Sequence, residues 1–439
     1  MRKPKWILVC AFAALLLGGC GARTVDQMYC LPKRSEDYNN LQSAIESAMG
    51  TMDYCAPLAG ENQQTVQMAD LDGDGEQEYL VFAKGSAEKP LNILIFQEEE
   101  EGYVLAQTIE GYGTAFDQVE YVMMDGSGST LLVVGSQLSD QVLRSVKVYA
   151  FRDGKTEQLL SANYTKFLTC DLNDDTFQEI LVIRPGQTET DKGIAELYHM
   201  VKGTLERSNE VNMSEPADRL KRIVSGKLHG GKPAVYVASA VHENAIITDV
   251  FTLVNRVFTN VSFSNESGTS VKTLRNYYVY ADDIDNDGVV ELPSLITMQP
   301  MENTQSAERQ YLIRWYAMAA DGSEVDKLYT YHNFAGGWYL VLDASLASRM
   351  TVVQSGGSYE CYLWNGDFTE AKKLLTFFTF TGQNRDEMSI SDGRFVLYKT
   401  DTTIYCASLE PEAAEIGMTQ ETLTGSFHMI YRDWNTGET

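Results

Sequence analysis

The stretch "MADLDGDGEQEYLVF" places carboxylates at every second position of a short segment. The residues that set this pattern are Asp70, Asp72, Asp74, Gly75 and Glu78. Carboxylates this close repel one another, so the spacing indicates a loop that wraps a hard cation, with glycine permitting the sharp turn. Ca2+ prefers such oxygen ligands. An EF-hand has its glutamate at the twelfth position between two helices, whereas here the glutamate is ninth and a strand-like run follows it.

The same pattern returns twice further along the chain. The segment "CDLNDDTFQEILVIR" contains Asp171, Asn173, Asp175 and Glu179, and the segment "DDIDNDGVVELPSLI" contains Asp283, Asp285, Asp287, Gly288 and Glu291. Two weaker copies keep Asp125 with Gly128, and Gly231 alone. Each acidic copy precedes an apolar, strand-like segment. An acidic turn without metal remains the alternative for each of them.

The spacing of the copies predicts the fold. Aligned on the glycine position they fall at Gly75, Gly128, Thr176, Gly231 and Gly288, with steps of 53, 48, 55 and 57 residues. A period near 50 residues suits a four-stranded propeller blade, and each interval holds two further strand-like runs joined by a polar turn. We therefore predict an all-β, seven-bladed β-propeller over residues 62–439. The last two blades would be formed by residues 338–380 and 388–434, with a final strand from residue 427. Six or eight blades remain open, because these last two copies have lost their acids.

The nine-residue loop Asp-x-Asp-x-Asp-Gly-x-x-Glu, placed between the first two strands of a blade, resembles the FG-GAP and VCBS-type repeats of integrin-α-like β-propellers. The resemblance implies Ca2+ held by the side chains at loop positions one, three, five and nine and by the backbone carbonyl of position seven, which is Glu76 in the first loop and Val289 in the third. In the middle copy Thr176 replaces the glycine. The Phe-Gly-Gly-Ala-Pro signature of FG-GAP repeats is absent. The resemblance therefore implies two structural Ca2+ sites and a third that departs from the pattern.

The N-terminus predicts export. Arg2, Lys3 and Lys5 precede an apolar run from Trp6 to Leu17 that is too short to span a bilayer. The following "LGGC" resembles the lipobox of bacterial lipoproteins, which implies a signal peptide over residues 1–19 and palmitate-type acylation of Cys20. An ordinary signal peptide is the alternative. Residues 20–61 would then form a lipidated segment with one short helix from Ser35, in which Leu41, Ile45 and Met49 recur at helical spacing. This predicts an extracytoplasmic protein anchored to the bacterial cell membrane by lipid.

The net charge limits the classes of partner that the protein could bind, and the cysteines offer one candidate disulfide. The net charge is -26, and removal of three positive residues with the signal brings it to about -29. Such a charge disfavours binding to nucleic acid or to anionic lipid surfaces. Of the seven cysteines, Cys30 and Cys55 are the candidate disulfide pair, with buried free thiols as the alternative.

Motifs for catalysis are not found in the sequence. The five histidines form no HExxH motif, and neither a GxSxG elbow nor a P-loop is present. Four tryptophans, Trp315, Trp338, Trp364 and Trp434, could stack on sugars or fill gaps between sheets. We therefore expect a non-catalytic binding or scaffold module for a protein or glycan at the cell surface. The alternatives are an extracellular hydrolase or lyase with its site in the propeller funnel, and a factor that assists assembly of other surface proteins.

Overall fold

A computed structural model of the chain describes residues 36–100, 102–138, 143–188, 190–298, 310–364 and 370–431. The predicted signal peptide, Cys20, Cys30 and Trp434 lie outside these residues, so the predictions that concern them are not tested. None of the helices in the described part combines the length and the apolar character that a membrane crossing requires.

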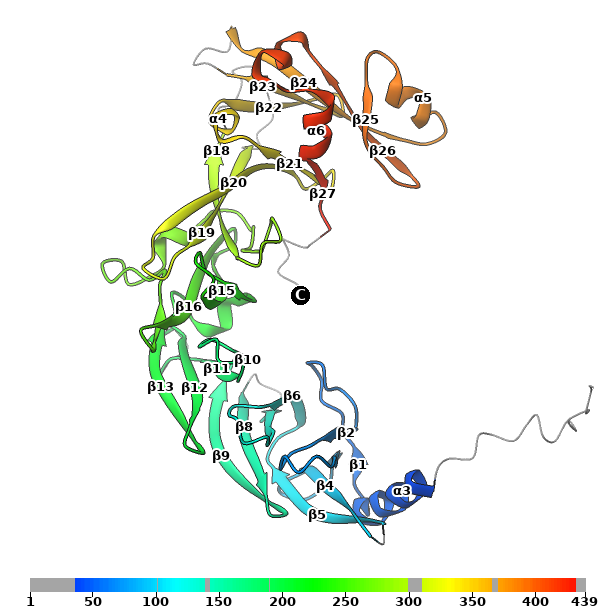
Figure 1. Cartoon of the computed structure of the whole chain (residues 1–439), viewed down its shortest axis with the longest axis vertical. Coiled ribbons are helices and arrows are strands. Elements are labelled where there is room, and N and C mark those ends of the chain that lie inside the picture. The colour runs from blue at the N-terminus through cyan, green and yellow to red at the C-terminus, as the bar shows by residue number, and fades with distance from the viewer. Residues whose placement is uncertain are drawn as a thin grey trace, which may run out of the picture.

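The described residues form six antiparallel β-sheets that follow one another along an arc (Figure 1). The first sheet contains β1 (Asp53–Tyr54), β2 (Val66–Ala69), β3 (Glu78–Lys84), β4 (Leu91–Glu99) and β5 (Gly102–Gly111). The second contains β6 (Ala115–Val122), β7 (Leu131–Gln137), β8 (Arg144–Arg152) and β9 (Lys155–Tyr164). The third contains β10 (Lys166–Cys170), β11 (Glu179–Arg184), β12 (Ile194–Val201) and β13 (Thr204–Asn212).

The later sheets continue in chain order. The fourth contains β14 (Leu220–Lys227), β15 (Pro233–His242), β16 (Ala245–Val254) and β17 (Val257–Asn260). The fifth contains β18 (Glu291–Thr297), β19 (Tyr311–Met318), β20 (Glu324–Asn333), β21 (Trp338–Leu342) and β27 (Phe427–Met429). The sixth contains β22 (Met350–Ser355), β23 (Ser358–Leu363), β24 (Lys372–Thr381), β25 (Phe395–Lys399) and β26 (Thr403–Leu409).

The hydrophobic core lies between successive sheets. Apolar residues of β3 and β4 pack with those of β6, β7 and β8, and the same arrangement continues from the second sheet to the third and from the third to the fourth. Smaller clusters join the fourth sheet to the fifth, and the largest joins the fifth to the sixth. The central strands are buried on both faces, as the six-residue buried run in β4 illustrates. Each sheet is therefore stabilised mainly by its two neighbours.

Most of the predicted architecture is present, but the predicted blade count and ring closure are not confirmed. The segments expected to form the sixth and seventh blades share one sheet, in which β24 pairs with β23 on one side and with β26 on the other. The predicted strand around residue 427 joins the fifth sheet as β27. The first and sixth sheets stand apart at the two ends of the arc (Figure 1). The last two repeats lack acidic loops, so the period alone could not show which sheet their strands would join.

Few helices accompany the sheets. They are α3 (Glu36–Met49), η1 (Ala217–Arg219), η2 (Val271–Thr273), α4 (Ala344–Ala347), α5 (Arg385–Ile390), η4 (Pro411–Ile416) and α6 (Gln420–Ser426). The helix expected near the N-terminus is α3, and its Ile45 and Met49 pack on Val81 and Leu94 of the first sheet. The strand β1 follows this helix and pairs with β3, so part of the predicted N-terminal segment belongs to the first sheet.

Candidate metal centres

The acidic loops occupy equivalent places in the sheets. The first runs from β2 to β3 and the second from β10 to β11, while the third precedes β18 and is closed by a bridge between Asp282 and Glu291. The predicted position of these loops, between the first two strands of a repeat, is therefore confirmed for the first two.

Each loop is built around its first aspartate. Asp70 accepts backbone hydrogen bonds from Gly73 and Gly75 at 2.8 and 3.0 Å. Asp171 and Asp283 accept equivalent bonds from the backbone of their own loops. An aspartate that accepts hydrogen bonds from several main-chain N–H groups fixes the turn. Hydrogen bonds within each loop therefore define its conformation without a ligand.

Left-handed backbone conformations occur at the fourth and sixth loop positions. Gly73 and Gly75 have φ angles of 81° and 92° in the first loop, and the second loop has Asp174 at 63° and Thr176 at 77°. A β-branched residue in this region is strained by about 1–2 kcal/mol relative to glycine. The departure noticed in the second copy therefore lies at a position where the backbone requires glycine.

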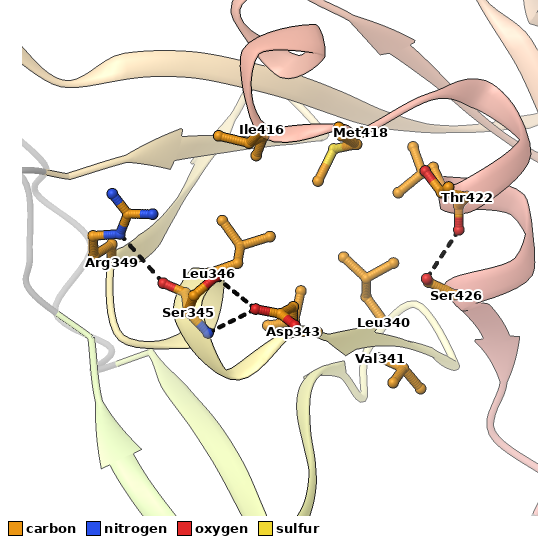
Figure 2. A pocket seen from close by; sticks show the side chains of 13 residues that line it. Leu340, Val341, Asp343, Ser345, Leu346, Arg349, Ile416, Met418, Thr422 and Ser426 are labelled. Carbon is orange, nitrogen blue, oxygen red and sulfur yellow. Dashed lines mark hydrogen bonds between the residues drawn. The ribbon is translucent and has the colours of Figure 1, made fainter.

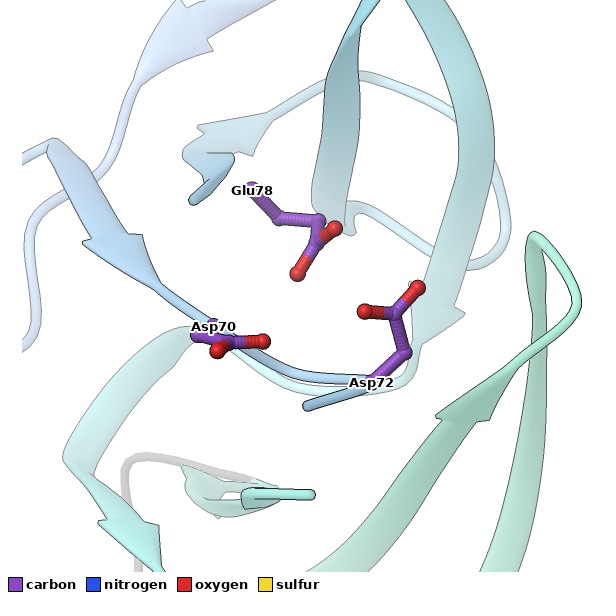
Figure 3. Close-up of side chains that lie close together, drawn as sticks. All are labelled: Asp70, Asp72 and Glu78. Carbon is purple, nitrogen blue, oxygen red and sulfur yellow. The ribbon is translucent and has the colours of Figure 1, made fainter. Parts of the chain in front are cut away.

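The first loop brings together three of its predicted ligands. Asp70, Asp72 and Glu78 each offer a carboxylate oxygen, and these oxygens lie within 4.8 Å of one another. Figure 3 shows the three carboxylates pointing toward a common space. Among the described residues, no lysine or arginine forms an ion pair with them. Within the described part of the chain these carboxylates receive hydrogen bonds from neutral groups and no ion pair.

Glu78 is the buried member of this cluster, with 2% of its surface exposed. Its Oε2 accepts a hydrogen bond from the Leu71 backbone at 2.7 Å, and its Oε1 accepts one from the Gln97 side chain at 3.1 Å. Burial raises the pKa of Glu78, and it also raises the pKa of Asp72. Burial therefore disfavours the charged form of both carboxyl groups unless a cation balances it. Gln97, which sequence reasoning missed, supports the glutamate from the adjacent strand.

The third loop forms a matching cluster from Asp283, Asp285 and Glu291, again with oxygens within 4.8 Å. Glu291 has no exposed surface, and its Oε1 accepts no hydrogen bond. Burial raises the pKa of Glu291 to about 7. This loop differs from the first because Lys327 of β20 reaches into it.

Lys327 was not recognised in the sequence. Its Nζ bonds to Asp287 Oδ2 and lies 3.8 Å from both Asp285 Oδ2 and Glu291 Oε1. The bond to Lys327 lowers the pKa of Asp287, and the same bond raises the pKa of Lys327. A comparison of the β20 segment with the equivalent strands of the other repeats could have identified Lys327 from the sequence.

Among the described residues the second loop has no cluster of three carboxylates, and Asn173 holds the place that Asp72 and Asp285 hold in the other loops. The Asn173 side chain donates a hydrogen bond to Glu179 Oε1 at 2.6 Å, and the Leu172 backbone donates to Oε2 at 2.8 Å. Burial raises the pKa of Glu179 to about 7. The amide of Asn173 therefore supports the glutamate where the other loops have aspartate carboxylates.

The remaining predicted ligands lie outside the two clusters. Asp74 and Asp287, at position five, accept hydrogen bonds from the backbone of Glu76 and Val289 at 2.8 Å. Asp175 makes the same bond to Phe177 at 2.9 Å. The ligand roles of these aspartates and of the Glu76 and Val289 carbonyls stay predictions.

The residues of the first and third loops fit a divalent cation on chemical grounds. The donors are all oxygens, one carboxylate in each cluster is buried, and Glu291 keeps an oxygen that accepts no hydrogen bond. Ca2+ and Mg2+ are the hard cations that prefer such oxygen ligands. A cation there would neutralise the repelling carboxylates and hold the loop closed.

A small pocket lies away from these loops, between β21, α4 and the segment from η4 to α6 (Figure 2). Its volume is about 190 Å3, and its walls include Leu340, Leu346 and Met418. Asp343 accepts two hydrogen bonds from Ser345, and Arg349 donates one to the Ser345 carbonyl. These polar groups stabilise α4. The described residues lining the pocket include no histidine that could serve as a base.

Two tryptophans and one histidine are buried. Trp315 and Trp338 have at most 1% of their surface exposed. Trp338 packs against Phe377 of the sixth sheet, so the prediction that the tryptophans fill space between sheets is confirmed for this one, whereas Trp315 packs among residues of the fifth sheet and its flanking segments. The His332 ring contacts the rings of Trp315 and Tyr339. Burial lowers the pKa of His332 to about 3.

Comparison with known proteins adds little to this description. No family model matches the chain, and no curated protein matches it either. Among solved structures, the exotype rhamnogalacturonan lyase YesX aligns with 72% of this chain and 68% of its own, at 11% identity and a TM-score of 0.30.

Proposed function

We propose that this protein is a Ca2+-binding module of the bacterial cell surface that presents a binding surface to a protein or glycan. The observation that carries the proposal is the pair of carboxylate clusters at equivalent places in the first and fifth sheets. The proposed role of Ca2+ is structural, because each cluster lies in a loop between strands.

The place of these loops explains why a cation would matter to the whole molecule. In the first loop the Leu71 carbonyl accepts a hydrogen bond at 3.1 Å from the backbone of Thr130, which directly precedes β7 of the second sheet. In the third loop the Val290 backbone donates to the Lys227 carbonyl of the fourth sheet, at 3.0 Å. Both loops therefore lie at junctions between sheets. Ca2+ bound there would stiffen the junctions and fix how neighbouring sheets present their surfaces.

The proposal treats each sheet as a blade of a propeller-like fold, since the sheets are antiparallel, follow the chain order and carry their loops at the same place. It also includes acylation of Cys20, which would hold the module at the outer side of the membrane. Both elements rest on the sequence pattern and are open to direct test.

The ligand proposal is tested by capture of cell-envelope components on the mature chain, with Ca2+ and with chelator. The Asp72→Asn variant removes one carboxylate from the first cluster. Asp125→Asn is the matched control, because Asp125 lies at the equivalent place in the second repeat and belongs to neither cluster. We expect a partner that is retained with Ca2+ by the natural protein and by the control, and is lost with chelator or with Asp72→Asn.

Retention that is equal in both buffers would reject the Ca2+-dependent part of the proposal. If no partner is retained in either buffer, the binding role is rejected and envelope polysaccharides should be tested as substrates. The anchor is tested separately by metabolic labelling with palmitate. We expect label on the natural chain and none on Cys20→Ser, and label on neither would reject acylation.

A further inference from the structure

In the first, second, third and fifth sheets a β-bulge lies at an equivalent place, in β5, β9, β13 and β20. In the fifth sheet Trp315 pairs with Leu328 and Tyr316 pairs with Asp326, so Lys327 is the extra residue. In the first sheet Ile95 pairs with Gln107 and Phe96 pairs with Leu105, so Ala106 is the extra residue. A β-bulge re-aims the side chain of the extra residue. Lys327 and Ala106 therefore hold equivalent positions in two repeats.

The second and third sheets have a bulge at the same place, whereas β16 and β17 of the fourth sheet pair without a register shift. In the second sheet the extra residue is Leu159, between pairs made by Leu160 and Gln158. In the third sheet the register shifts between Glu210 and Arg207, where Ser208 lies. Among these four repeats, only the fifth sheet has a cationic side chain at the bulge.

The bulge faces the acidic loop. Lys327 shows this directly, because its ammonium contacts Asp287 and lies 3.8 Å from carboxylate oxygens of Asp285 and Glu291. In the first sheet Ala106 packs against the hydrophobic cluster that contains Leu80 and Phe82, and these two residues share a face of β3 with Glu78 by strand alternation. A short side chain at position 106 leaves the first cluster without an internal cation.

We propose that Lys327 is an internal counter-cation that competes with Ca2+ for the third loop, whereas the first loop has no such competitor. The inference rests on the proposed Ca2+ binding and deepens it. The buried Glu291 carboxylate, with one oxygen that accepts no hydrogen bond, shows that the third loop still has a donor for a metal ion. Ca2+ enters this loop by displacing the ammonium, whose side chain is 20% exposed and has a path to solvent.

The consequence is a protein with two Ca2+ sites of different strength. The first loop binds at low Ca2+ concentration, and the third binds only when Ca2+ outcompetes the lysine. In the absence of Ca2+, Lys327 keeps the third loop closed and the junction between the fourth and fifth sheets ordered. The junction between the first and second sheets depends on Ca2+ more strongly.

The test exchanges the bulge residues and measures Ca2+ affinity by isothermal titration calorimetry on the mature chain. Asp72→Asn isolates the third loop, and Asp285→Asn isolates the first. Because charge pairs at such distances shift equilibria by tenfold or more, we expect Lys327→Met to raise the affinity of the third loop roughly tenfold or more. Ala106→Lys should lower the affinity of the first loop by a similar factor, and Ala106→Met, its uncharged size control, should leave it within about twofold.

A second readout does not depend on affinity. With chelator present, hydrogen exchange in the third loop should become faster in Lys327→Met than in the natural chain, and Ca2+ should reverse the order. If Ca2+ binds both loops but Lys327→Met leaves the third-loop affinity unchanged or weaker, the inference fails while the proposed function stands. If neither loop binds Ca2+ in the natural chain, and Lys327→Met does not create binding, both fail.

Discussion

Replacement of Glu78 by glutamine should change the stability of the first loop in opposite directions with and without Ca2+. Glu78 is buried, and its carboxylate belongs to a cluster with Asp70 and Asp72 whose oxygens lie within 4.8 Å. Two unit charges at about 4 Å repel by roughly 4 kcal/mol at an effective dielectric of about 20, and partial exposure of the aspartates reduces this value. Glutamine keeps the shape, and its carbonyl can still accept the hydrogen bond from Leu71.

The expected change in stability follows from the charge repulsion, the hydrogen bonds and the free energy of Ca2+ binding. With chelator, loss of the repulsion outweighs the weaker hydrogen bonds, so the variant loop should be more stable by on the order of 1 kcal/mol. With Ca2+ at about 100 times its dissociation constant, the natural loop gains about 2.7 kcal/mol from binding, and most of this gain is lost in the variant. The order of stability should therefore reverse, with the natural chain ahead by on the order of 1 kcal/mol in Ca2+.

Hydrogen exchange of the β2 and β3 amides measures this local opening free energy in both buffers. Asp125→Asn serves as the control, and it should leave the exchange of β3 unchanged in either buffer. A variant that is less stable than the natural chain with chelator as well, or that keeps the full gain with Ca2+, would refute the assignment of Glu78 as a repelling carboxylate that a cation neutralises.

Three further predictions concern the rest of the molecule. The pKa of His332 is about 3 in the folded protein and about 6.5 in the unfolded chain, so its neutral ring contributes folding stability that is complete above pH 6.5 and is lost as the pH falls toward 3. The free energy of unfolding should therefore drop by about 2 kcal/mol from pH 7 to pH 5. Urea titrations should show a smaller drop in His332→Phe. Replacement of Asp249 by alanine should lower the free energy of unfolding by about 3–5 kcal/mol, because this buried side chain accepts hydrogen bonds from Ser214, Asn260 and Ser270. Urea unfolding measures this loss, and a loss below about 1 kcal/mol would contradict the network. Gly75→Ala should lower the free energy of unfolding by roughly 1–2 kcal/mol, and Gly73→Ala should lower it clearly more. Both glycines have positive φ, but only a Cβ at position 73 would lie 2.6 Å from the Gly128 backbone. Thermal unfolding measures both losses, and equal losses would show that the contact with Gly128 is not tight.

Much of the local structure could be predicted from the sequence because it depends on residues close together in the chain. The alternating acids and the glycine frame predicted turns that the structure places at Asp70 and Asp283, and the helical spacing of Ile45 and Met49 predicted α3. The order of the last strands could not be predicted in this way. The choice of β24 to pair with β26 as well as β23 depends on which partner buries more apolar surface, and the local pattern contains no such information.

The sequence by itself determined the repeated loops, their oxygen-rich chemistry and the all-β character, since each follows from charge spacing and from strand periodicity. Only the tertiary structure decided which loops gather their carboxylates. It brought Asp70 and Asp72 toward Glu78, and it placed Asn173 against Glu179. It also places the side chain of Lys327, which lies 36 positions after Glu291 in the sequence, against the third loop. A contact between distant residues depends on strand register and on the bulge in β20, and these arise only when the sheet assembles.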